Sequence, residues 1–175
     1  DAVLDAAKEL QKMNRPEIKI LLIGQGKLKA VLQKRAKKEQ ITNVFFHDPV
    51  AKDQLAQLML SADLGLQILA NIPAFYYGTS PNKFFDYIAA GLPVLTNYPG
   101  WVCDIVNDNQ CGFTIPADDP KGFASALVAA ADQRHELPQW GERALAVARK
   151  DFNRIRLSEK FTKTLEKINS NVNDL

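Results

Sequence analysis

Residues 80–95 read SPNKFFDYIAAGLPVL. Ser80 is a favourable N-cap residue, and Pro81 suits the first helical position, where no backbone N–H is needed. Gly91 favours the end of this helix, and the apolar residues after Pro93 read as a buried strand. The stretch therefore predicts a helix that leads directly into a strand, the repeating unit of an α/β fold.

The front of this predicted helix carries an unusual charge. Lys83 occupies the third helical position, where the helix dipole disfavours a cation by roughly 0.3–1 kcal/mol. A bound anion reverses that sign, so the amides of Ser80 and Asn82 together with Lys83 predict a phosphate site. Asp86 lies one turn later, where it can accept hydrogen bonds from sugar hydroxyls. The alternatives are capping alone and an ion pair between Lys83 and Asp86, worth about 0.2–0.5 kcal/mol.

Composition excludes several classes of protein. The chain has 175 residues, 46% hydrophobic and 24% charged, which is typical of one soluble globular domain. A net charge of +2 gives no reason to expect nucleic acid as a partner. Cys103 and Cys111, with His47 and His135, form no metal-binding pattern, so we expect no metal and reduced thiols.

The chain contains no apolar run of 18 residues and no signal-peptide pattern, so a cytoplasmic location is expected. It opens at Asp1 directly into a helical pattern, which indicates a piece of a longer protein. Lysines cover one side of the predicted helix 27–40, and Leu28, Val31, Leu32 and Ala36 lie on the other. This lysine face reads as solvated; weak attraction to anionic lipids at the inner face of the membrane is the alternative.

Helical and strand patterns alternate along the chain. The predicted helices are 1–14, 27–40, 51–61, 80–91, 101–107, 118–132, 138–150 and 153–168, and 169–175 is a frayed polar tail. The predicted strands are 18–23, 44–46, 64–69, 94–96 and 112–115. Short connections between them predict a Rossmann-like, doubly wound parallel sheet with helices on both faces.

In such sheets ligands bind beyond the carboxyl ends of the strands. Gly24 and Gly26 follow the first predicted strand, and His47 and Asp48 follow the second, so all four are candidate nucleotide contacts. The glycines fall short of a dinucleotide fingerprint because Lys29 stands where the third glycine belongs. An NAD site with Asp48 on the ribose, hence a dehydrogenase, remains an alternative.

The order of these features resembles the C-terminal, donor-binding domain of GT-B glycosyltransferases in the large retaining group that uses nucleotide sugars. The resemblance covers nearly the whole chain. Its motifs are LIGQG at 22–26, NVFF at 43–46, SADL at 61–64, AGLPV at 90–94 and GF at 112–113 followed by Pro116.

The resemblance implies roles for particular residues. The second acid of the family's E-x7-E signature falls on Asp86, which implies a contact with the nucleotide ribose, whereas the first acid falls on Gly78. The SPNK helix start is similar to a branch that builds bacterial surface polysaccharides from UDP-linked sugars, with Lys83 toward the diphosphate. Residues 1–168 would be a donor domain that lacks its first strand, and the N-terminal acceptor domain would lie outside this chain.

The expected function follows from these roles. The parent protein would transfer a hexose-type sugar, with retention, from UDP to a carbohydrate or lipid-linked acceptor in polysaccharide biosynthesis. Lys83 would stabilise the leaving diphosphate without a metal cofactor. The chain alone would bind nucleotide weakly and catalyse nothing. The alternative, which Gly78 favours, is a non-catalytic nucleotide-binding module.

An aromatic segment precedes the SPNK motif. Phe75, Tyr76 and Tyr77 suit either anchors in the core or the wall of a donor pocket, because aromatic side chains pack well in both. The sequence leaves the two interpretations open.

Overall fold

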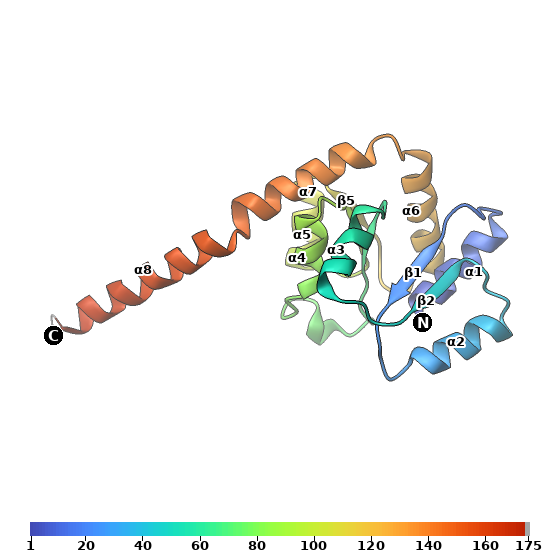
Figure 1. Cartoon of the computed structure of the whole chain (residues 1–175), viewed down its shortest axis with the longest axis horizontal. Coiled ribbons are helices and arrows are strands. Elements are labelled where there is room, and N and C mark those ends of the chain that lie inside the picture. Colours follow the sequence, from blue (N-terminus) through green and yellow to red (C-terminus); the bar gives the residue numbers. More distant parts are fainter. Residues whose placement is uncertain (174–175) are drawn as a thin grey trace.

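Strands and helices alternate in the computed structural model, which describes the backbone of residues 1–173 and the side chains of residues 1–169 (Figure 1). The strands are β1 (Ile20–Ile23), β2 (Val44–His47), β3 (Gly65–Gln67), β4 (Val94–Thr96) and β5 (Gly112–Thr114). The helices are α1 (Ala2–Lys12), α2 (Lys29–Lys38), α3 (Lys52–Leu60), α4 (Asn82–Ala89), α5 (Trp101–Asp108), α6 (Pro120–Asp132), α7 (Leu137–Asp151) and α8 (Arg154–Asn173), with a 3-10 turn, η1 (Pro73–Phe75). All five predicted strands are present.

The strands pair in parallel, in two groups. β1 pairs with β2, with Leu21 opposite Phe45. β4 lies between β3 and β5, with Leu95 opposite Leu66 on one side and Phe113 on the other. The parallel pairing confirms the predicted α/β class, and the division into two groups is a feature that the sequence did not predict.

Helices cover both faces of the strands, as a doubly wound fold requires. On one face, Leu4 and Leu10 of α1 and Phe123 of α6 pack on Ile20 and Leu95. Figure 1 shows α1 and α6 side by side, and the Arg15 guanidinium bonds Asp132 at 2.8 Å across their ends. This cluster takes side chains from both groups of strands.

The opposite face is covered over β3–β5 only. Phe84 and Ile88 of α4, Val102 and Val106 of α5, and Val147 of α7 surround Val94 there. On β1 and β2 the corresponding side chains, Leu21 and Phe45, are 50% and 46% exposed. α3 buries none of its residues.

Several predicted boundaries differ from the structure. Of the four apolar residues predicted on one side of α2, Leu32 and Ala36 pack against the core, whereas Leu28 and Val31 are 59% and 60% exposed. The last helix continues to Asn173 rather than ending near residue 168, so most of the predicted polar tail is helical. Residues 174–175 of that tail lie outside the described residues.

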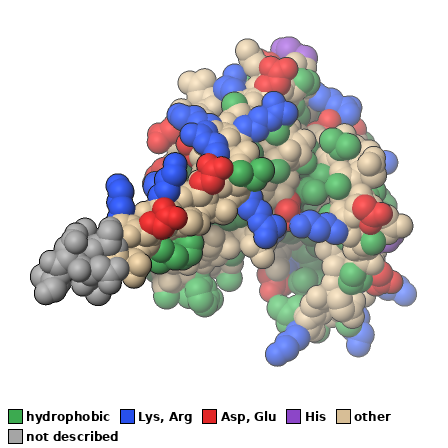
Figure 2. Space-filling model, turned by 60° about the vertical axis from the view of Figure 1, so that its left-hand side comes forward, with side chains coloured by type: hydrophobic (Ala, Val, Ile, Leu, Met, Phe, Trp, Pro, Cys, Tyr) green, Lys and Arg blue, Asp and Glu red, His purple; other side chains and the backbone are tan. Residues whose placement is uncertain are grey.

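α8 projects away from the body as a single arm (Figure 1). Hydrophobic side chains lie along one side of this arm, opposite acidic and basic ones (Figure 2). The exposed apolar residues of α8 are Ile155, Leu157, Phe161, Leu165 and Ile168.

Candidate functional site

The start of α4 lies at the carboxyl ends of the strands, where the sequence predicts the ligand. Helical geometry begins at Asn82, and the residue before it, Pro81, has extended backbone (φ −81°, ψ 116°). No side chain caps this end, so the predicted N-cap role of Ser80 is wrong. Phe84 N–H bonds Pro81 O at 3.0 Å, which leaves the amides of Asn82 and Lys83 without a protein acceptor among the described residues.

Lys83 has no carboxylate within ion-pair distance in residues 1–169. Its side chain reaches solvent, yet the surrounding protein partly buries it, and this burial lowers the pKa of the ammonium. A cation in a partly dehydrated position without a counter-charge favours an anionic ligand.

Asp86 is half-buried on the same side of α4, one turn beyond Lys83. The described side chains include no ion pair between these two residues, so the simple pairing alternative is not what the structure has. Burial first, and then the Asp86 charge, raise the pKa of the Tyr87 hydroxyl. The Asp86 carboxylate therefore has free acceptor positions at this edge.

The loop that leads into α4 is held at four points, none of which the sequence predicted. The Asn97 side chain bonds Leu69 N at 2.8 Å and Leu69 O at 2.9 Å. Trp101 Nε1 donates to Thr79 O at 3.0 Å. The other two ties are the hydrogen bond from Asn71 Nδ2 to Asp118 Oδ2 and the stacking of Tyr76 on Tyr98. These ties hold the loop that precedes Lys83.

The aromatic segment contains both a core anchor and exposed rings. Tyr76 is buried in the core cluster, and its hydroxyl donates to Asn71. Phe75 and Tyr77 are largely exposed in the loop. Tyr76 is therefore the anchor, and the two exposed rings are free to contact a ligand.

On the other side of the site, Lys29 joins the loops after β1 and β2. Its Nζ donates to Gly24 O at 3.0 Å, to His47 O at 2.9 Å and to Asp48 Oδ1 at 2.6 Å. The side chain is only 14% exposed, so Lys29 does not belong to the solvated lysine face. Asp48 is thus neutralised, and the hydrogen bond from Lys29 lowers the pKa of its carboxyl group.

Two glycines shape the loop after β1. Gly24 has φ +141°, a conformation that other residues rarely adopt. Gly26 lies in open space, as does Gly78 in the loop before α4: a Cβ at either would meet nothing within 4 Å. The position of the missing first acid could thus hold a side chain.

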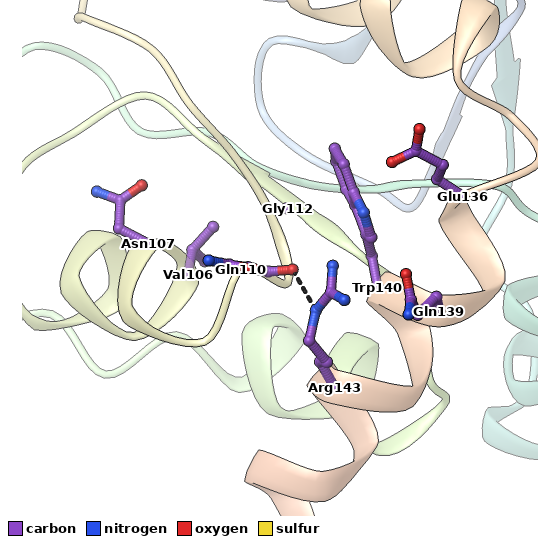
Figure 3. A pocket seen from close by; sticks show the side chains of 8 residues that line it. All are labelled: Val106, Asn107, Gln110, Gly112, Glu136, Gln139, Trp140 and Arg143. Atoms are coloured by element: carbon purple, nitrogen blue, oxygen red, sulfur yellow. Dashed lines mark hydrogen bonds between the residues drawn. The ribbon is translucent and has the colours of Figure 1, made fainter.

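A hollow in the described surface lies elsewhere. It has a volume of ≈ 480 Å³ between α5 and α7, at the amino end of β5, where Arg143 Nε donates to Gln110 O at 2.8 Å (Figure 3). Parallel strands place their two ends at opposite edges, so this hollow is separate from Lys83. We place the candidate site at the unpaired charges of Lys83 and Asp86, because the size of an open hollow alone gives no specificity for a ligand.

No group of three or more His, Cys, Asp and Glu side chains that could hold a metal is present among the described residues. No described helix is long and apolar enough to cross a bilayer. Cys111 belongs to the core cluster, and its burial raises the pKa of the thiol to about 11.

Comparison with known proteins decides the family. The family model for group 1 glycosyl transferases matches residues 1–133. The chain belongs to this family. No curated protein sequence matches the chain.

Solved structures agree with this group 1 assignment. Pneumococcal O-GlcNAc transferase GtfA, in complex with UDP and GlcNAc, matches with a TM-score of 0.73 and 19% identity over 96% of this chain and 33% of its own. Anabaena HepE, in complex with UDP-glucose, matches with a TM-score of 0.76 and 18% identity over 94% of this chain and 44% of its own. WaaG, a glycosyltransferase involved in lipopolysaccharide biosynthesis, matches with a TM-score of 0.65 and 25% identity over 86% of this chain and 39% of its own. The neighbours share the Rossmann-like fold of GT-B enzymes, and this group 1 chain spans less than half of their length.

Proposed function

We propose that this chain is the donor-binding half of a glycosyltransferase that moves a sugar from UDP to a carbohydrate or lipid-linked acceptor in polysaccharide biosynthesis. The observation that carries the proposal is Lys83, an unpaired cation at the uncapped start of α4. Two of the similar structures contain UDP or UDP-glucose, which supports a UDP-linked donor.

The proposed roles divide between the two unpaired charges. The Lys83 ammonium and the free amides of Asn82 and Lys83 bind the diphosphate, and Asp86 accepts hydrogen bonds from the ribose hydroxyls. As the glycosidic bond breaks, negative charge grows on the leaving diphosphate. Donors that are already oriented stabilise this charge more than they stabilise the bound donor. The chemistry then needs no metal; retention of configuration is part of the proposal.

The other candidate residues complete the nucleotide pocket. We assign the loop of Gly24 and Gly26 and the loop of His47 and Asp48 to the nucleoside side. Asp48 contributes through its backbone, because Lys29 holds its carboxylate. The acceptor is assigned to a separate N-terminal domain, and the location to the cytoplasm, with the exposed lysines of α2, which do not include Lys29, toward the inner face of the membrane.

Calorimetry of the chain with UDP tests the donor site. We expect weak binding, and Lys83→Ala should lower the affinity about tenfold, because a charge-assisted hydrogen bond contributes about 1.5–3 kcal/mol. Lys19→Ala is the control: it makes the same change of charge at an exposed position before β1, at the opposite edge. Equal affinities of the two variants, or no heat with any of them, would contradict the proposal.

Gly78 supports a second candidate, a nucleotide-binding module without catalysis. A family acid is absent there although the space is open. Turnover of a UDP-sugar by the whole protein separates the two functions, since a module binds UDP without releasing sugar. For the enzyme, Asp86→Ala should raise the donor KM; unchanged donor kinetics would remove Asp86 from the ribose role.

A further inference from the structure

The hollow between α5 and α7 has a lining that the donor site does not use. Its α7 wall consists of four side chains whose spacing of three or four residues puts them on one side of the helix start: Glu136, Gln139, Trp140 and Arg143. Gln110 faces them from the turn after α5 (Figure 3). The volume of ≈ 480 Å³ lies within the range of small-molecule sites, roughly 300–1,000 Å³.

Arg143 is oriented by the backbone of the opposite wall. Its Nε donates to Gln110 O at 2.8 Å. Because the guanidinium is planar, this bond also sets the direction of the two Nη groups, which lie on the side of Trp140 and Gln139 (Figure 3). No carboxylate of residues 1–169 is within ion-pair distance of Arg143. Its fork of N–H donors is therefore available to a pair of neighbouring oxygen atoms on a ligand.

The Trp140 indole supplies the apolar part of the lining. It packs on Phe113 of β5, with a centroid distance of 4.9 Å and an interplanar angle of 54°. This contact holds the ring in place, and the part of it that Phe113 leaves uncovered borders the hollow. A tryptophan ring in such a position offers a ligand a flat apolar surface.

The polar groups around the ring include both donors and acceptors. Glu136 supplies carboxylate oxygens, and the described side chains include no ion pair between it and Arg143. The exposed side chains of Gln110 and Gln139 each supply an amide, which donates and accepts. Asn107 also borders the hollow, but its amide already bonds two other side chains of the protein. The lining thus combines one positive charge, one negative charge and two free amides.

This combination matches a neutral sugar better than an ion or an apolar molecule. An anion beside Arg143 would also meet the Glu136 carboxylate, and a cation would meet the guanidinium. An apolar ligand would remove these polar groups from water without giving hydrogen bonds in return, which is unfavourable. A sugar ring has a face of C–H groups that can stack on Trp140 and a rim of hydroxyls, each of which donates and accepts.

We propose that the hollow between α5 and α7 binds a neutral oligosaccharide, at the edge of the sheet opposite Lys83. One sugar ring stacks on Trp140, and its hydroxyls bond the Arg143 fork and the surrounding Glu136 and glutamine side chains. The site shares no residue with the donor site, so it stands whether or not UDP binds. Its use rests on the proposed function: an enzyme that extends a glycan can hold the product here between transfers.

The indole N–H signals in a nitrogen–proton NMR correlation spectrum test this site directly. The chain has two tryptophans, and Trp101 is an internal reference because its Nε1 donates to Thr79 O, away from the hollow. Titration with maltotriose, cellotriose and triacetylchitotriose should shift the Trp140 signal in a saturable way for at least one of them, with Trp101 unchanged. UDP should leave the Trp140 signal in place. No shift of Trp140 with any of these sugars, or equal shifts of both indoles, would overturn the proposal.

Two substitutions on α7 test the role of the guanidinium with the same signal. Arg143→Ala should lower the affinity for the bound sugar about tenfold, because it removes hydrogen bonds from a charged donor. Arg149→Ala is the control, since it makes the same change of charge at an exposed position outside the hollow. Backbone signals show whether each variant is folded, and Gln139→Ala replaces Arg143→Ala if that variant is not.

An anionic sugar separates this proposal from a simple anion site. Trigalacturonate should bind more weakly than the neutral sugar, because its carboxylates meet Glu136. Tighter binding of trigalacturonate, or equal affinities of the Arg143→Ala and Arg149→Ala variants for the neutral sugar, would overturn the proposal.

Discussion

The β3–β5 half and the β1–β2 half of this domain have the same kind of strands but different surroundings. Helices α4, α5 and α7 cover one face of β3–β5, and α6 covers the other. β1 and β2 are covered on one face only, and Leu21 and Phe45 are half-exposed on the other. The half that holds the unpaired charges is thus the one that is packed from both sides, which suits a site that must be rigid.

Truncation of one aromatic side chain in each half is the strongest way to break this comparison. Phe84 is fully buried and packs edge-on against Trp101 at a centroid distance of 5.8 Å, so Phe84→Ala should lower the free energy of unfolding by about 3–5 kcal/mol. Phe45→Ala should cost roughly 1 kcal/mol, since about half of that ring is already in water. Urea denaturation measures both; equal costs would contradict the comparison, and Phe84→Leu serves if Phe84→Ala does not fold.

A pair of glycines gives the next largest difference. A Cβ at Gly141 of α7 would lie 2.1 Å from Gly91 O, so Gly141→Ala must push α7 away from the end of α4. We expect a cost of about 1–3 kcal/mol from overpacking. Gly26→Ala, in the β1–β2 half, enters open space and should change stability by less than about 0.5 kcal/mol. Thermal unfolding measures both variants. If Gly26→Ala were destabilising and Gly141→Ala neutral, the β3–β5 half would not be the more tightly packed one.

The smallest expected effect comes from the two lysines at the carboxyl edge of the strands, which differ in their hydrogen-bond partners. Lys29 is satisfied by protein acceptors. Lys83 has no ion-pair partner among the described side chains, and burial lowers its pKa below the ordinary value. Affinity for UDP should therefore hold at neutral pH and fall as the pH rises through the folded pKa of Lys83. For the free protein the sign is opposite: the unfolded chain binds more protons in that window, so stability rises with pH there.

A charge that does not titrate is the control for this pH dependence. Lys83→Arg should keep UDP affinity to higher pH, because the guanidinium stays protonated. Titrations at several pH values compare wild type, Lys83→Arg and Lys19→Ala. If the arginine variant loses affinity in parallel with wild type, another group, or the nucleotide itself, is responsible.

Much of the fold was predictable because each strand is a short apolar run and each helix has a regular apolar face. The predictions that were wrong concern contacts between residues that are far apart in the sequence. Lys29 has the spacing of a solvated lysine, and only the folded loops bring two carbonyl groups and Asp48 to its Nζ. Spacing puts Leu28 and Val31 on the same side of α2 as Leu32 and Ala36, but the folded core contacts only the latter two.

The candidate site was predictable in position more than in detail. The strand-end rule led to Lys83 and Asp86, and both are without an ion-pair partner among the described side chains. Ser80 has the chemistry of a cap, but the extended backbone of Pro81 delays the helix until Asn82. The ties of Asn97 and Trp101 to the loop join residues far apart in the sequence, so no local pattern indicates them.

The projecting α8 makes the short joint at its base mechanically important. Twenty residues at a rise of 1.5 Å give this helix a length of about 30 Å. Its first turn is fixed by Asn153, whose Oδ1 accepts from Ile155 N at 3.1 Å and from Arg156 N at 3.2 Å. A tilt of about 10° at this corner would carry the far end through roughly 5 Å, the pitch of one helical turn. The hydrogen bonds of Asn153 therefore help set the direction in which the whole of α8 projects.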